Sequence, residues 1–468
     1  MTIRIALDLG SSKIAILAYD VRHGRTVASA TATVAAREDA DPDLSLWNVE
    51  WFWRTSVELL RELSGQVNVK DCAGITVTGQ QHGVVLLDGE SGLRPCSSFI
   101  SWMDGRGRRR GGNGCTLEEE VRSRLESVTS GELGCRMATG YGGLTLYDLN
   151  RRGLIPPGAV MVFLTDYINK RLCGMRKSVT DPTMAASSGL FDVRSMRWSE
   201  AGVGALGLRS SLFPEVVATG TRLGGLAREV SAATGFPAGL PVYQGWGDNQ
   251  ASIQGCLGVR PKEEQAFPVV INYGTGTQVT VLASEFRASN EYETRPFLDG
   301  RFLLVRSEPS GGRAWALLRD FFLQTGRELF QTELAPEEMY DRMKSLADEG
   351  SDPEMVCRPR FFPCRHGHGG EEETGSFSRI QAACFTPGEM IRSLLAGMAN
   401  ESYEHWQVLA RVVCGETKDK SVMLLGSGNM FRKNPVFCKC VERRFGLPVH
   451  LSGVREEAAV GTALLPVQ

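Results

Sequence analysis

Hydrophobic residues near the start of the chain form two short runs that are separated by small polar residues. The runs Ile3–Leu9 and Ile14–Tyr19 flank Gly10-Ser11-Ser12. Apolar segments of this length around a glycine predict two strands joined by a tight turn. The pattern returns far downstream, where Val269–Tyr273 and Thr277–Leu282 flank another glycine turn. The chain therefore contains two predicted hairpins of similar design.

These two hairpins align without gaps, so that Asp8 falls on Asn272 and the glycine and hydroxyl residues of the two turns coincide. The alignment predicts a duplicated α/β domain, with one copy in residues 1–240 and the other in residues 241–468. The natural ligand site of such a pair is the cleft between the copies. The alternative is two unrelated hairpins, because glycine turns between apolar strands are common.

The glycine turns also predict a chemistry. Backbone N–H groups at such a turn can converge on an anion, and Ser or Thr hydroxyls add donors. We expect the two turns to hold a polyphosphate, with Asp8 placed to orient a hydrated Mg²⁺ ion. A third loop, Gly426-Ser427-Gly428-Asn429, stands between an apolar strand-like run and the amphipathic Pro435–Phe445. Strand, glycine loop and helix form a common nucleotide site, although many α/β proteins have such loops.

Polar residues that suit a polyhydroxylated ligand follow two predicted strands of the first half. Gln80-Gln81-His82 stands at the end of the strand predicted around Ile75–Val77, and Ser101–Arg106 follows the next short apolar run. Sugar hydroxyls require both donors and acceptors, which amide, imidazole, carboxylate and guanidinium groups supply. The alternative is that His82 satisfies a strand-end carbonyl group and that Trp102 belongs to the core.

One carboxylate, Asp248, lies among glycines and small polar residues in Gly245–Ser252. An ordinary turn has the same composition. The two preceding glycines, Gly245 and Gly247, would also let the backbone bring this carboxylate close to a ligand. The pattern alone leaves both interpretations open.

Composition excludes several classes of protein. A chain of 468 residues predicts two or three domains, and a net charge of −2 gives no global basic field for nucleic acid or an anionic membrane. The basic cluster Arg106–Arg110, at the start of the glycine-rich loop 106–114, is interpreted as a solvated loop, with a nucleic-acid contact as the alternative. No apolar run approaches the roughly 20 residues of a membrane span. We expect neither a nucleic-acid nor a membrane partner.

Cysteine usage bears on compartment and metal content. Twelve cysteines in a chain without a recognisable signal peptide predict reduced thiols and a cytoplasmic location. The densest group is Cys357, Cys364, His366 and His368. Zinc is conceivable there, but no Cys-x-x-Cys pair occurs, so unligated thiols and loop histidines are the favoured interpretation.

The order of these features resembles the FGGY family of carbohydrate kinases, which belongs to the actin/hexokinase/Hsp70-like ATPase superfamily. Nine segments that span nearly the whole chain carry the resemblance: Ala6–Lys13, Gly79–Gly83, Trp102–Arg106, Leu164–Ile168, Thr180–Ser187, Gly247–Asn249, Tyr273–Gly276, Gly426–Gly428 and Glu457–Gly461. The resemblance implies two ribonuclease H-like α/β domains with an active site in the cleft between them. Residues 1–240 would carry the sugar side and the first phosphate turn. Residues 241–468 would carry the catalytic base, the second phosphate turn and the adenosine loop.

The resemblance also implies the cofactors ATP and Mg²⁺ and a role for each site residue. Asp248 would be the general base and Asp8 would organise Mg²⁺ and the phosphates. The sugar-binding residues would be Gln81, His82, Asp104 and Asn249, with Arg106 supporting Asp104. The nucleotide would be held by Gly10, Ser11, Ser12, Lys13, Gly274, Thr275, Thr277, Gly312, Gly426, Gly428 and Asn429. A hinge is expected near residues 238–245, and a homodimer is plausible by the same resemblance.

The substrate implied is a ketose. Several segments are most similar to sedoheptulokinase-like members of the family, which makes sedoheptulose the first choice and D-xylulose, or another ketose or polyol, the alternative. Gln81 stands where many relatives carry methionine, which bears on the sugar rather than on the reaction. The alternatives from other classes are a chaperone-like or filament-forming ATPase, a non-catalytic ATP- and sugar-binding sensor, and an unrelated binding module. Sugar-dependent ADP release distinguishes the kinase from all three.

Overall fold

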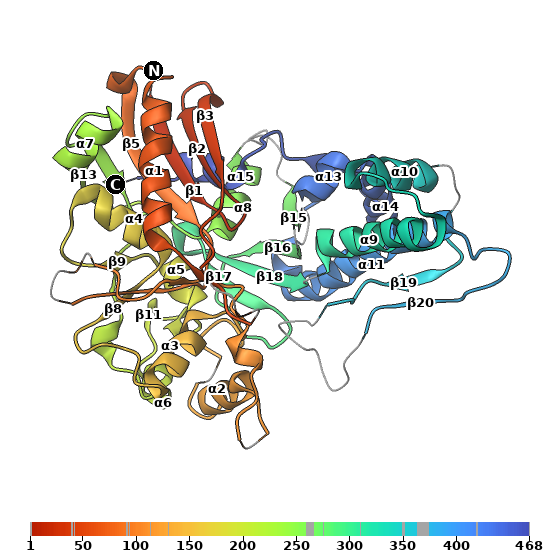
Figure 1. The fold of residues 1–468 in the computed structure, drawn as a ribbon, viewed down its shortest axis with the longest axis horizontal. Helices are drawn as coiled ribbons and strands as arrows, with labels where there is room; N and C mark the ends of the chain where they lie inside the picture. Colours follow the sequence, from red (N-terminus) through yellow and green to blue (C-terminus); the bar gives the residue numbers. More distant parts are fainter. Residues whose placement is uncertain are drawn as a thin grey trace. The chain divides into compact units, whose positions relative to one another are not determined.

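The protein consists of two compact α/β units in the computed structural model (Figure 1). The structure describes residues 2–38, 41, 43–89, 92, 94–112, 114–129, 131–258, 266–274, 276–308, 310–348, 352–362, 374–417 and 420–467. Unit 1 comprises residues 1–260, 284–303 and 453–468, and unit 2 comprises residues 261–283 and 304–452.

Unit 1 is built on a six-stranded sheet. Its strands follow the order β13 (Arg222–Gly225), β14 (Pro241–Tyr243), β5 (Cys72–Gly79), β1 (Ile3–Leu9), β2 (Lys13–Asp20) and β3 (Arg25–Thr33). Strand β1 is antiparallel to β2 and parallel to β5. The predicted first hairpin and the strand before Gln80 are therefore confirmed.

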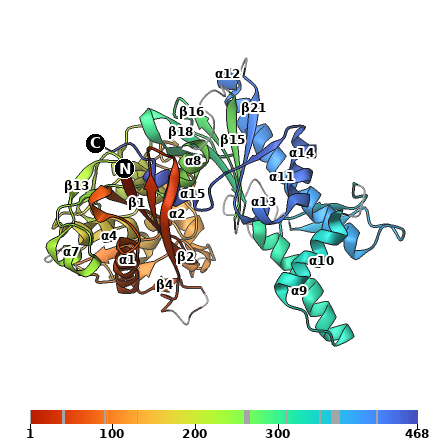
Figure 2. The same ribbon diagram turned by 90° about the horizontal axis from the view of Figure 1, so that it is seen from above.

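Both faces of this sheet are buried. Alternate residues of β1, such as Ile5 and Leu7, pack with Phe52 and Leu60 of α1 (Val49–Ser64) in one core. Ala6 faces the other way and packs on Ala459 of α15 (Glu457–Ala463). This alternation follows from the two-residue period of a strand, and the helices on the sheet are visible in Figures 1 and 2.

The remaining elements of unit 1 are short. The helices are α2 (Leu117–Glu126), α3 (Gly142–Arg151), α4 (Leu164–Cys173), α5 (Pro182–Ser187), α6 (Glu200–Ala205), α7 (Arg228–Thr234) and α8 (Asp248–Gly258). The strands are β4 (Leu46–Trp47), β6 (Val85–Leu87), β7 (Phe99–Ile100), β8 (Val160–Val162), β9 (Val179–Thr180), β10 (Phe191–Asp192), β11 (Arg197–Trp198), β12 (Glu215–Val216) and β17 (Glu293–Pro296). A second core lies among α2, α3 and β6–β8, around Leu144 and Phe163.

Unit 2 repeats the arrangement. Its sheet contains, in order, β18 (Phe302–Glu308), β16 (Thr277–Ala283), β15 (Phe267–Tyr273), β21 (Val422–Ser427) and β22 (Val449–Leu451). Strand β15 is antiparallel to β16 and parallel to β21, just as β1 is to β2 and β5. The other elements are α9 (Gly311–Phe330), α10 (Pro336–Asp348), β19 (Val356–Arg358), β20 (Ser376–Ser378), α11 (Pro387–Val412), α12 (Cys414–Thr417), α13 (Asn429–Lys433) and α14 (Pro435–Phe445). The predicted duplication of a ribonuclease H-like α/β fold is confirmed.

The sequence predicted a division between the units at residue 240, but the two units do not divide there. Strand β14 pairs with β5, and α8 packs against α15, so residues 241–258 belong to unit 1. Residues 284–303 and the C-terminal segment 453–468 also return to unit 1. The segment 238–245 lies within unit 1 and includes a strand of its sheet, so it does not connect the two units.

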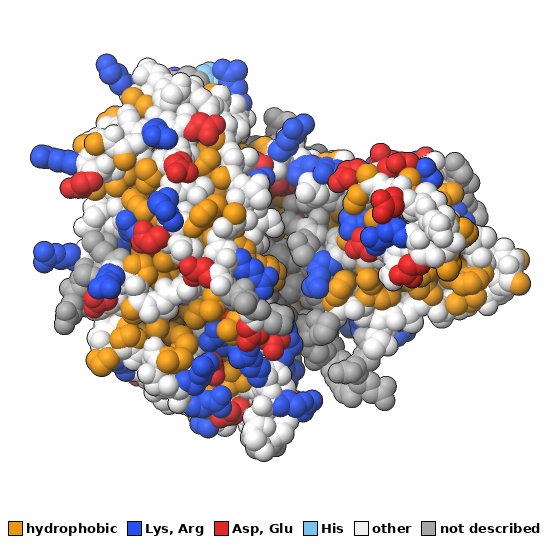
Figure 3. Space-filling view, viewed as in Figure 1, with side chains coloured by type: hydrophobic (Ala, Val, Ile, Leu, Met, Phe, Trp, Pro, Cys, Tyr) orange, Lys and Arg blue, Asp and Glu red, His pale blue; other side chains and the backbone are white. Residues whose placement is uncertain are grey.

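Surface charges match the weak net charge of the sequence. On the face that Figure 3 shows, Lys and Arg side chains are interspersed with Asp and Glu. Within the basic loop, Arg106 is buried rather than solvated, and Arg109 pairs with Asp41. No helix among the described residues is long and apolar enough to cross a membrane.

The structure describes only part of the predicted cysteine and histidine group. The described cysteines carry free thiols, and Cys357 is buried. Cys364, His366 and His368 lie outside the described residues, so the predicted choice between zinc and unligated side chains stays a prediction for that segment. Among the described residues, no group of three or more His, Cys, Asp or Glu side chains could hold a metal ion.

Candidate active site

Asp248 is the first residue of α8 in unit 1, and the two glycines that precede it are packed too tightly for side chains. A Cβ atom on Gly245 would lie 1.8 Å from the carbonyl oxygen of Val77, and one on Gly247 would lie 2.3 Å from Nε2 of Gln81. The N–H of Gly247 donates to Oγ1 of Thr183 at 2.8 Å. The glycines therefore let the chain pass close to β5 and Gln81 and deliver Asp248 there.

A second carboxylate, Asp8 at the end of β1, interacts with Asp248 electrostatically. Burial raises the pKa of Asp8 to about 7, and the charges of Asp248 and Glu456 add to this effect. Burial also raises the pKa of Asp248 to about 6, although the N–H of Asn249 and the charge of Arg295 act in the opposite direction. Two carboxylates, separated by 240 residues of sequence, are thus held in a poorly solvated place in unit 1.

The Asp8 carboxylate fits the predicted Mg²⁺. Its buried Oδ1 has no hydrogen-bond partner, and a cation would lower its pKa and satisfy that oxygen. Mg²⁺ commonly uses only one or two carboxylates and completes its coordination with water and phosphate oxygens. Asp8 and its surroundings are therefore suited to this ion.

The predicted first phosphate turn, Gly10 to Lys13, begins two residues after Asp8 and joins β1 to β2. The carbonyl of Gly10 accepts a hydrogen bond from Nε2 of Gln80 at 3.5 Å, and Ser12 is exposed. Nζ of Lys13 lies 2.6 Å from Oε1 of Glu456, and the Lys13 side chain is 46% exposed. An incoming phosphate would therefore compete with Glu456 for this ammonium group.

A small pocket that includes Gln81 lies in unit 1. It is lined by Gln81, His82, Leu133, Cys135, Tyr141, Thr183, Ala186, Ser187, Glu293, Thr294 and Arg295. Nε2 of Gln81 donates to the carbonyl of Thr183 at 3.0 Å. Asn249 adjoins the pocket because its Oδ1 accepts from Nη1 of Arg295 at 3.0 Å. The lining combines apolar side chains with donors, acceptors and an aromatic ring, which are compatible with the hydroxyl groups and C–H faces of a sugar.

His82 is fixed in the pocket wall by an unusual backbone conformation and three contacts. Its φ is 73°, in the left-handed region that non-glycine residues seldom adopt. Its N–H donates to Oγ of Ser187 at 3.0 Å, and its Nδ1 lies 2.7 Å from the carbonyl oxygen of the same residue. A carbonyl only accepts, so Nδ1 carries the proton and Nε2 is the acceptor in the neutral ring. The ring stacks on Tyr141 with centroids 4.3 Å apart.

Asp104 does not take the role predicted for it. Its side chain is fully buried. Oδ1 accepts from the N–H and from Nε of Arg106, at 3.1 and 2.6 Å, and Oδ2 accepts from the N–H of Ser45 at 3.0 Å. Both oxygens are therefore used within the protein, and we remove Asp104 from the sugar-binding set. The sequence predicted a ligand-binding role because Trp102, Asp104 and Arg106 lie close together in the chain. That pattern does not show that the Asp104 side chain is buried.

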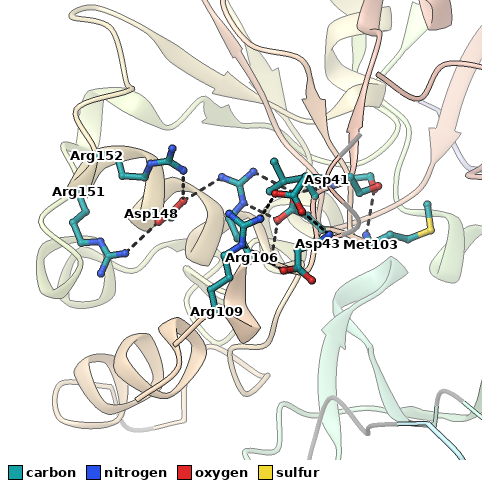
Figure 4. Close-up of polar contacts among 12 residues, drawn as sticks. Asp41, Asp43, Met103, Arg106, Arg109, Asp148, Arg151 and Arg152 are labelled. Atoms are coloured by element: carbon teal, nitrogen blue, oxygen red, sulfur yellow. Dashed lines mark hydrogen bonds and ion pairs between the residues drawn. The ribbon is translucent and has the colours of Figure 1, made fainter. Parts of the chain in front are cut away.

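The expectation that Arg106 supports Asp104 is confirmed. Its guanidinium also reaches Oδ2 of Asp148 at 3.4 Å, and Asp148 in turn contacts Arg151 and Arg152 (Figure 4). Arg109 bonds to Asp41 on the other side of this group. These contacts anchor the start of the loop 106–114 to unit 1.

In unit 2, three glycine segments that the sequence predicted separately come together. The N–H of Gly312, in the first turn of α9, donates to the carbonyl of Gly274 at 2.9 Å. Gly428 has a φ of 91°, and a Cβ atom there would lie 2.3 Å from the carbonyl oxygen of Tyr273. Nδ2 of Asn272 donates to Oγ of Ser427 at 3.1 Å. The turn after β15, the loop after β21 and the start of α9 thus lie together in unit 2, and glycine turns and a helix start are the features from which nucleotide sites are commonly built.

Individual residues of this group differ in access. Gly274 and Asn429 are exposed, and Gly428 and Gly312 are partly exposed. Gly426 lies buried within β21, and Thr277 is fully buried, so neither presents a side chain to a ligand. Thr275 lies outside the described residues, and its predicted role stays a prediction.

Gly274 permits a direct test of the nucleotide site. A Cβ atom there would meet only Oδ1 of Asn272, at 3.6 Å. We expect Gly274→Val to change the free energy of unfolding by less than about 0.5 kcal/mol. If a phosphate approaches this turn, the added side chain should weaken ATP binding at least about 10-fold by calorimetry. Gly415→Val, at an exposed glycine of unit 2 with open space around it, is the control, and unchanged ATP affinity in Gly274→Val would exclude the turn as a phosphate site.

Several pocket residues were not predicted from the sequence. Thr183 and Ser187 belong to a segment that carries the family resemblance, but no role was assigned to them. Tyr141, Glu293 and Arg295 had no signal at all, because they are 152 and 46 residues from the partners they contact. Only the folded chain brings them to the pocket.

Two ribonuclease H-like units, a polar pocket and a carboxylate pair in unit 1, and a group of glycine turns in unit 2 are the features that the sequence predicted for a sugar phosphotransferase. Comparison with known families agrees: residues 3–255 match the N-terminal domain of the FGGY family of carbohydrate kinases. This match covers more than half of the chain, so the protein belongs to that family, whose members use ATP, generally with Mg²⁺, to phosphorylate a small-molecule sugar.

Individual relatives are distant. The chain is 24% identical to sedoheptulokinase from Homo sapiens, over 99% of this chain and 97% of that one. It is also 24% identical to L-fuculokinase from Escherichia coli K12, over 98% and 91% of the two chains. The crystal structure of xylulose kinase from Rhodospirillum rubrum superposes with a TM-score of 0.81 at 22% identity, covering 98% of this chain and 88% of the other. The structural likeness supports the fold alone.

Proposed function

We propose that the protein transfers the γ-phosphoryl group of ATP to a hydroxyl group of a ketose, with sedoheptulose as the first candidate. The observation that carries the proposal is the position of Asp248. This carboxylate lies at the start of α8, next to Gln81 and Asn249, and Asn249 is bonded to a residue of the sugar-compatible pocket.

In the proposed reaction, Asp248 accepts the proton of the attacking hydroxyl group. The sugar oxygen forms a bond to the γ-phosphorus, and the bond from that phosphorus to the bridging oxygen of ADP breaks. A general base works best with a pKa near the operating pH, and burial raises the pKa of Asp248 to about 6. At neutral pH this base is ionised, yet it remains a better proton acceptor than an exposed aspartate.

The other residues bind and orient. Gln81, His82 and Asn249 hold the sugar, with Nε2 of His82 accepting from one of its hydroxyl groups. Asp8 and the turn from Gly10 to Lys13 hold Mg²⁺ and phosphate oxygens. The remaining nucleotide contacts come from Gly274, Thr275, Thr277, Gly312, Gly426, Gly428 and Asn429, with buried Thr277 and Gly426 contributing through position or backbone. Bound Mg²⁺ supplies charge neutralisation, which is most of what a loose phosphoryl-transfer transition state requires.

The choice of sedoheptulose rests on similarity and needs an experiment. Sedoheptulokinases from two mammals are among the similar proteins, at 24% and 25% identity. However, a fuculokinase reaches the same 24% identity, and xylulose kinase from Escherichia coli reaches 26%. D-Xylulose, or another ketose or polyol, is therefore the alternative substrate.

The test is sugar-dependent release of ADP from Mg-ATP. Purified protein is assayed with sedoheptulose, D-xylulose, L-fuculose, other ketoses, aldoses and polyols, and with no sugar as the control. We expect one sugar to raise kcat/KM to at least about 10⁴ M⁻¹s⁻¹, in the usual range of enzymes, while the others remain well below it. ATP binding without turnover on any sugar would favour a sugar sensor over a kinase.

A further inference from the structure

A buried ion pair on β17 is connected to both sides of the sugar pocket. Nε and Nη2 of Arg295 both bond to Oε2 of Glu293, at 2.8 and 2.5 Å. The two side chains are only 11% and 6% exposed. Both residues line the pocket. Neither was predicted from the sequence to have a role.

Each end of this pair holds a residue that we place at the sugar. The third guanidinium nitrogen, Nη1 of Arg295, donates to Oδ1 of Asn249 at 3.0 Å. At the other end, the hydroxyl of Tyr141 donates to Oε1 of Glu293 at 2.5 Å. The Tyr141 ring then stacks on His82. One ion pair therefore connects Asn249, which follows the proposed base, with the imidazole of His82 in the pocket wall.

The bond from Arg295 determines how Asn249 can act. The two ends of an asparagine amide differ only in being acceptor or donor, and the side chain can rotate to exchange them. Because a guanidinium only donates, it fixes Oδ1 on its own side and directs the NH₂ group away from itself. The NH₂ group of Asn249 is thereby held on the side away from Arg295, in the residue that directly follows the proposed base Asp248.

Stability alone is a poor explanation for such a pair. Removing two charges from water is unfavourable, and well-packed apolar residues often stabilise a protein as much as a buried ion pair does. Arginine also supplies three bonds in fixed directions, which lysine or an apolar residue does not.

We propose that the Glu293–Arg295 pair positions the sugar-binding side chains, Asn249 directly and His82 through Tyr141. Arg295 is thus a positioning residue that decides which hydroxyl pattern the site accepts. This inference rests on the proposed kinase function.

The test is a double-mutant cycle with Arg295→Lys, Asn249→Ala and the double variant. Lysine retains the positive charge beside Glu293 but cannot make the three bonds of the guanidinium. We expect Arg295→Lys to lower kcat/KM for the sugar about 10- to 100-fold and to leave the KM for ATP within about twofold. Since Arg295 acts through Asn249, the double variant should match Asn249→Ala within about twofold. Multiplicative, independent effects would overturn the inference.

Two further variants separate positioning from folding. Arg171→Lys is the matched control, because Arg171 is a partly buried arginine of unit 1 that pairs with Glu50 and Tyr167, neither of which lines the pocket, and its sugar kinetics should stay unchanged. Tyr141→Phe retains the ring on His82 but removes the bond to Glu293, and it should lower kcat/KM for the sugar about 3- to 10-fold. If Arg295→Lys does not fold, Tyr141→Phe is the test of the inference. An unchanged kcat/KM for the sugar in Tyr141→Phe would then overturn it.

The proposed function and this inference fail in different ways. If the unmodified protein releases no sugar-dependent ADP, the kinase proposal fails. The double-mutant cycle is then measured with dissociation constants for the sugar, determined by calorimetry. Absence of any sugar binding by the unmodified protein overturns both. Sugar-dependent turnover combined with independent effects of Arg295 and Asn249 overturns only the positioning role.

Discussion

Asp248→Asn should abolish most of the turnover while it leaves both substrates bound. The amide occupies nearly the same space as the carboxylate, but it cannot accept the proton of the attacking hydroxyl group. We expect kcat to fall at least about 10²-fold, with dissociation constants for sugar and ATP within about threefold of those of the unmodified protein. Initial rates of ADP release and calorimetric titrations measure the two quantities.

Stability and pH provide internal checks on this result. The raised pKa of Asp248 means that its charge is unfavourable in the folded state, so the folded variant should be at least as stable as the unmodified protein at pH 8. The base must be ionised to act, so kcat/KM of the unmodified protein should decrease as the pH falls through about 6. Asp192→Asn, at an acid of unit 1 whose contacts are local to its own turn, is the control. Near-normal turnover in Asp248→Asn would exclude this residue as the base.

Asp8→Asn is expected to have the other large effect, because it removes the carboxylate suited to Mg²⁺. Loss of one preorganised electrostatic contact to the transferring group typically lowers kcat about 10²- to 10³-fold. The Mg²⁺ concentration for half-maximal rate should increase, while binding of the sugar alone should not change. A rate profile at several Mg²⁺ concentrations, with sugar calorimetry in the absence of nucleotide, separates these effects.

The same substitution should stabilise the protein when Mg²⁺ is absent. The folded-state pKa of Asp8 is about 7, above the value of about 4 for an unfolded chain. Its contribution to stability is therefore fully present below pH 4 and is lost as the pH rises through 7. The free energy of unfolding, measured in urea, should decrease less between pH 5 and pH 8 for Asp8→Asn than for the unmodified protein.

Asp41→Asn is the control for this stability measurement, because the pKa of Asp41 is lowered whereas that of Asp8 is raised. The N–H of Asp43 and the guanidinium of Arg109 lower the pKa of this exposed acid, so removing it should not stabilise the protein at either pH. If Asp8→Asn and Asp41→Asn changed stability in the same direction, the electrostatic strain assigned to Asp8 would be wrong. Unchanged Mg²⁺ dependence of the rate in Asp8→Asn would exclude Asp8 as the metal-organising residue.

Local patterns in the sequence correctly predicted local structure. The hairpins around Gly10 and Gly274 and the strand and loop ending at Gly428 all depend on residues adjacent in sequence. Apolar alternation and glycine turns act over fewer than about ten residues, which explains why these elements are confirmed. The order of such segments along the chain was also sufficient to indicate the family.

Properties that depend on burial were not predictable in the same way. Asp104 has the composition and spacing of a ligand-binding acid, but the fold encloses it with Arg106 and Ser45. The division at residue 240 failed for a related reason. The helix that carries Asp248 packs on a helix from residues 457–463, and no local pattern encodes such a contact.

The sequence by itself determined the secondary structure around the glycine turns, the duplication and the family of the protein, because these follow from short-range patterns and their order. Only the tertiary structure decided which polar residues meet. It grouped Gly274, Gly312 and Gly428 in unit 2, and it placed Asp8 with Asp248 in unit 1. It also assigned Asp104 to the interior and brought the Glu293–Arg295 pair to the pocket. The physical reason is that desolvation and hydrogen bonding depend on neighbours in space, which the packing of distant segments supplies.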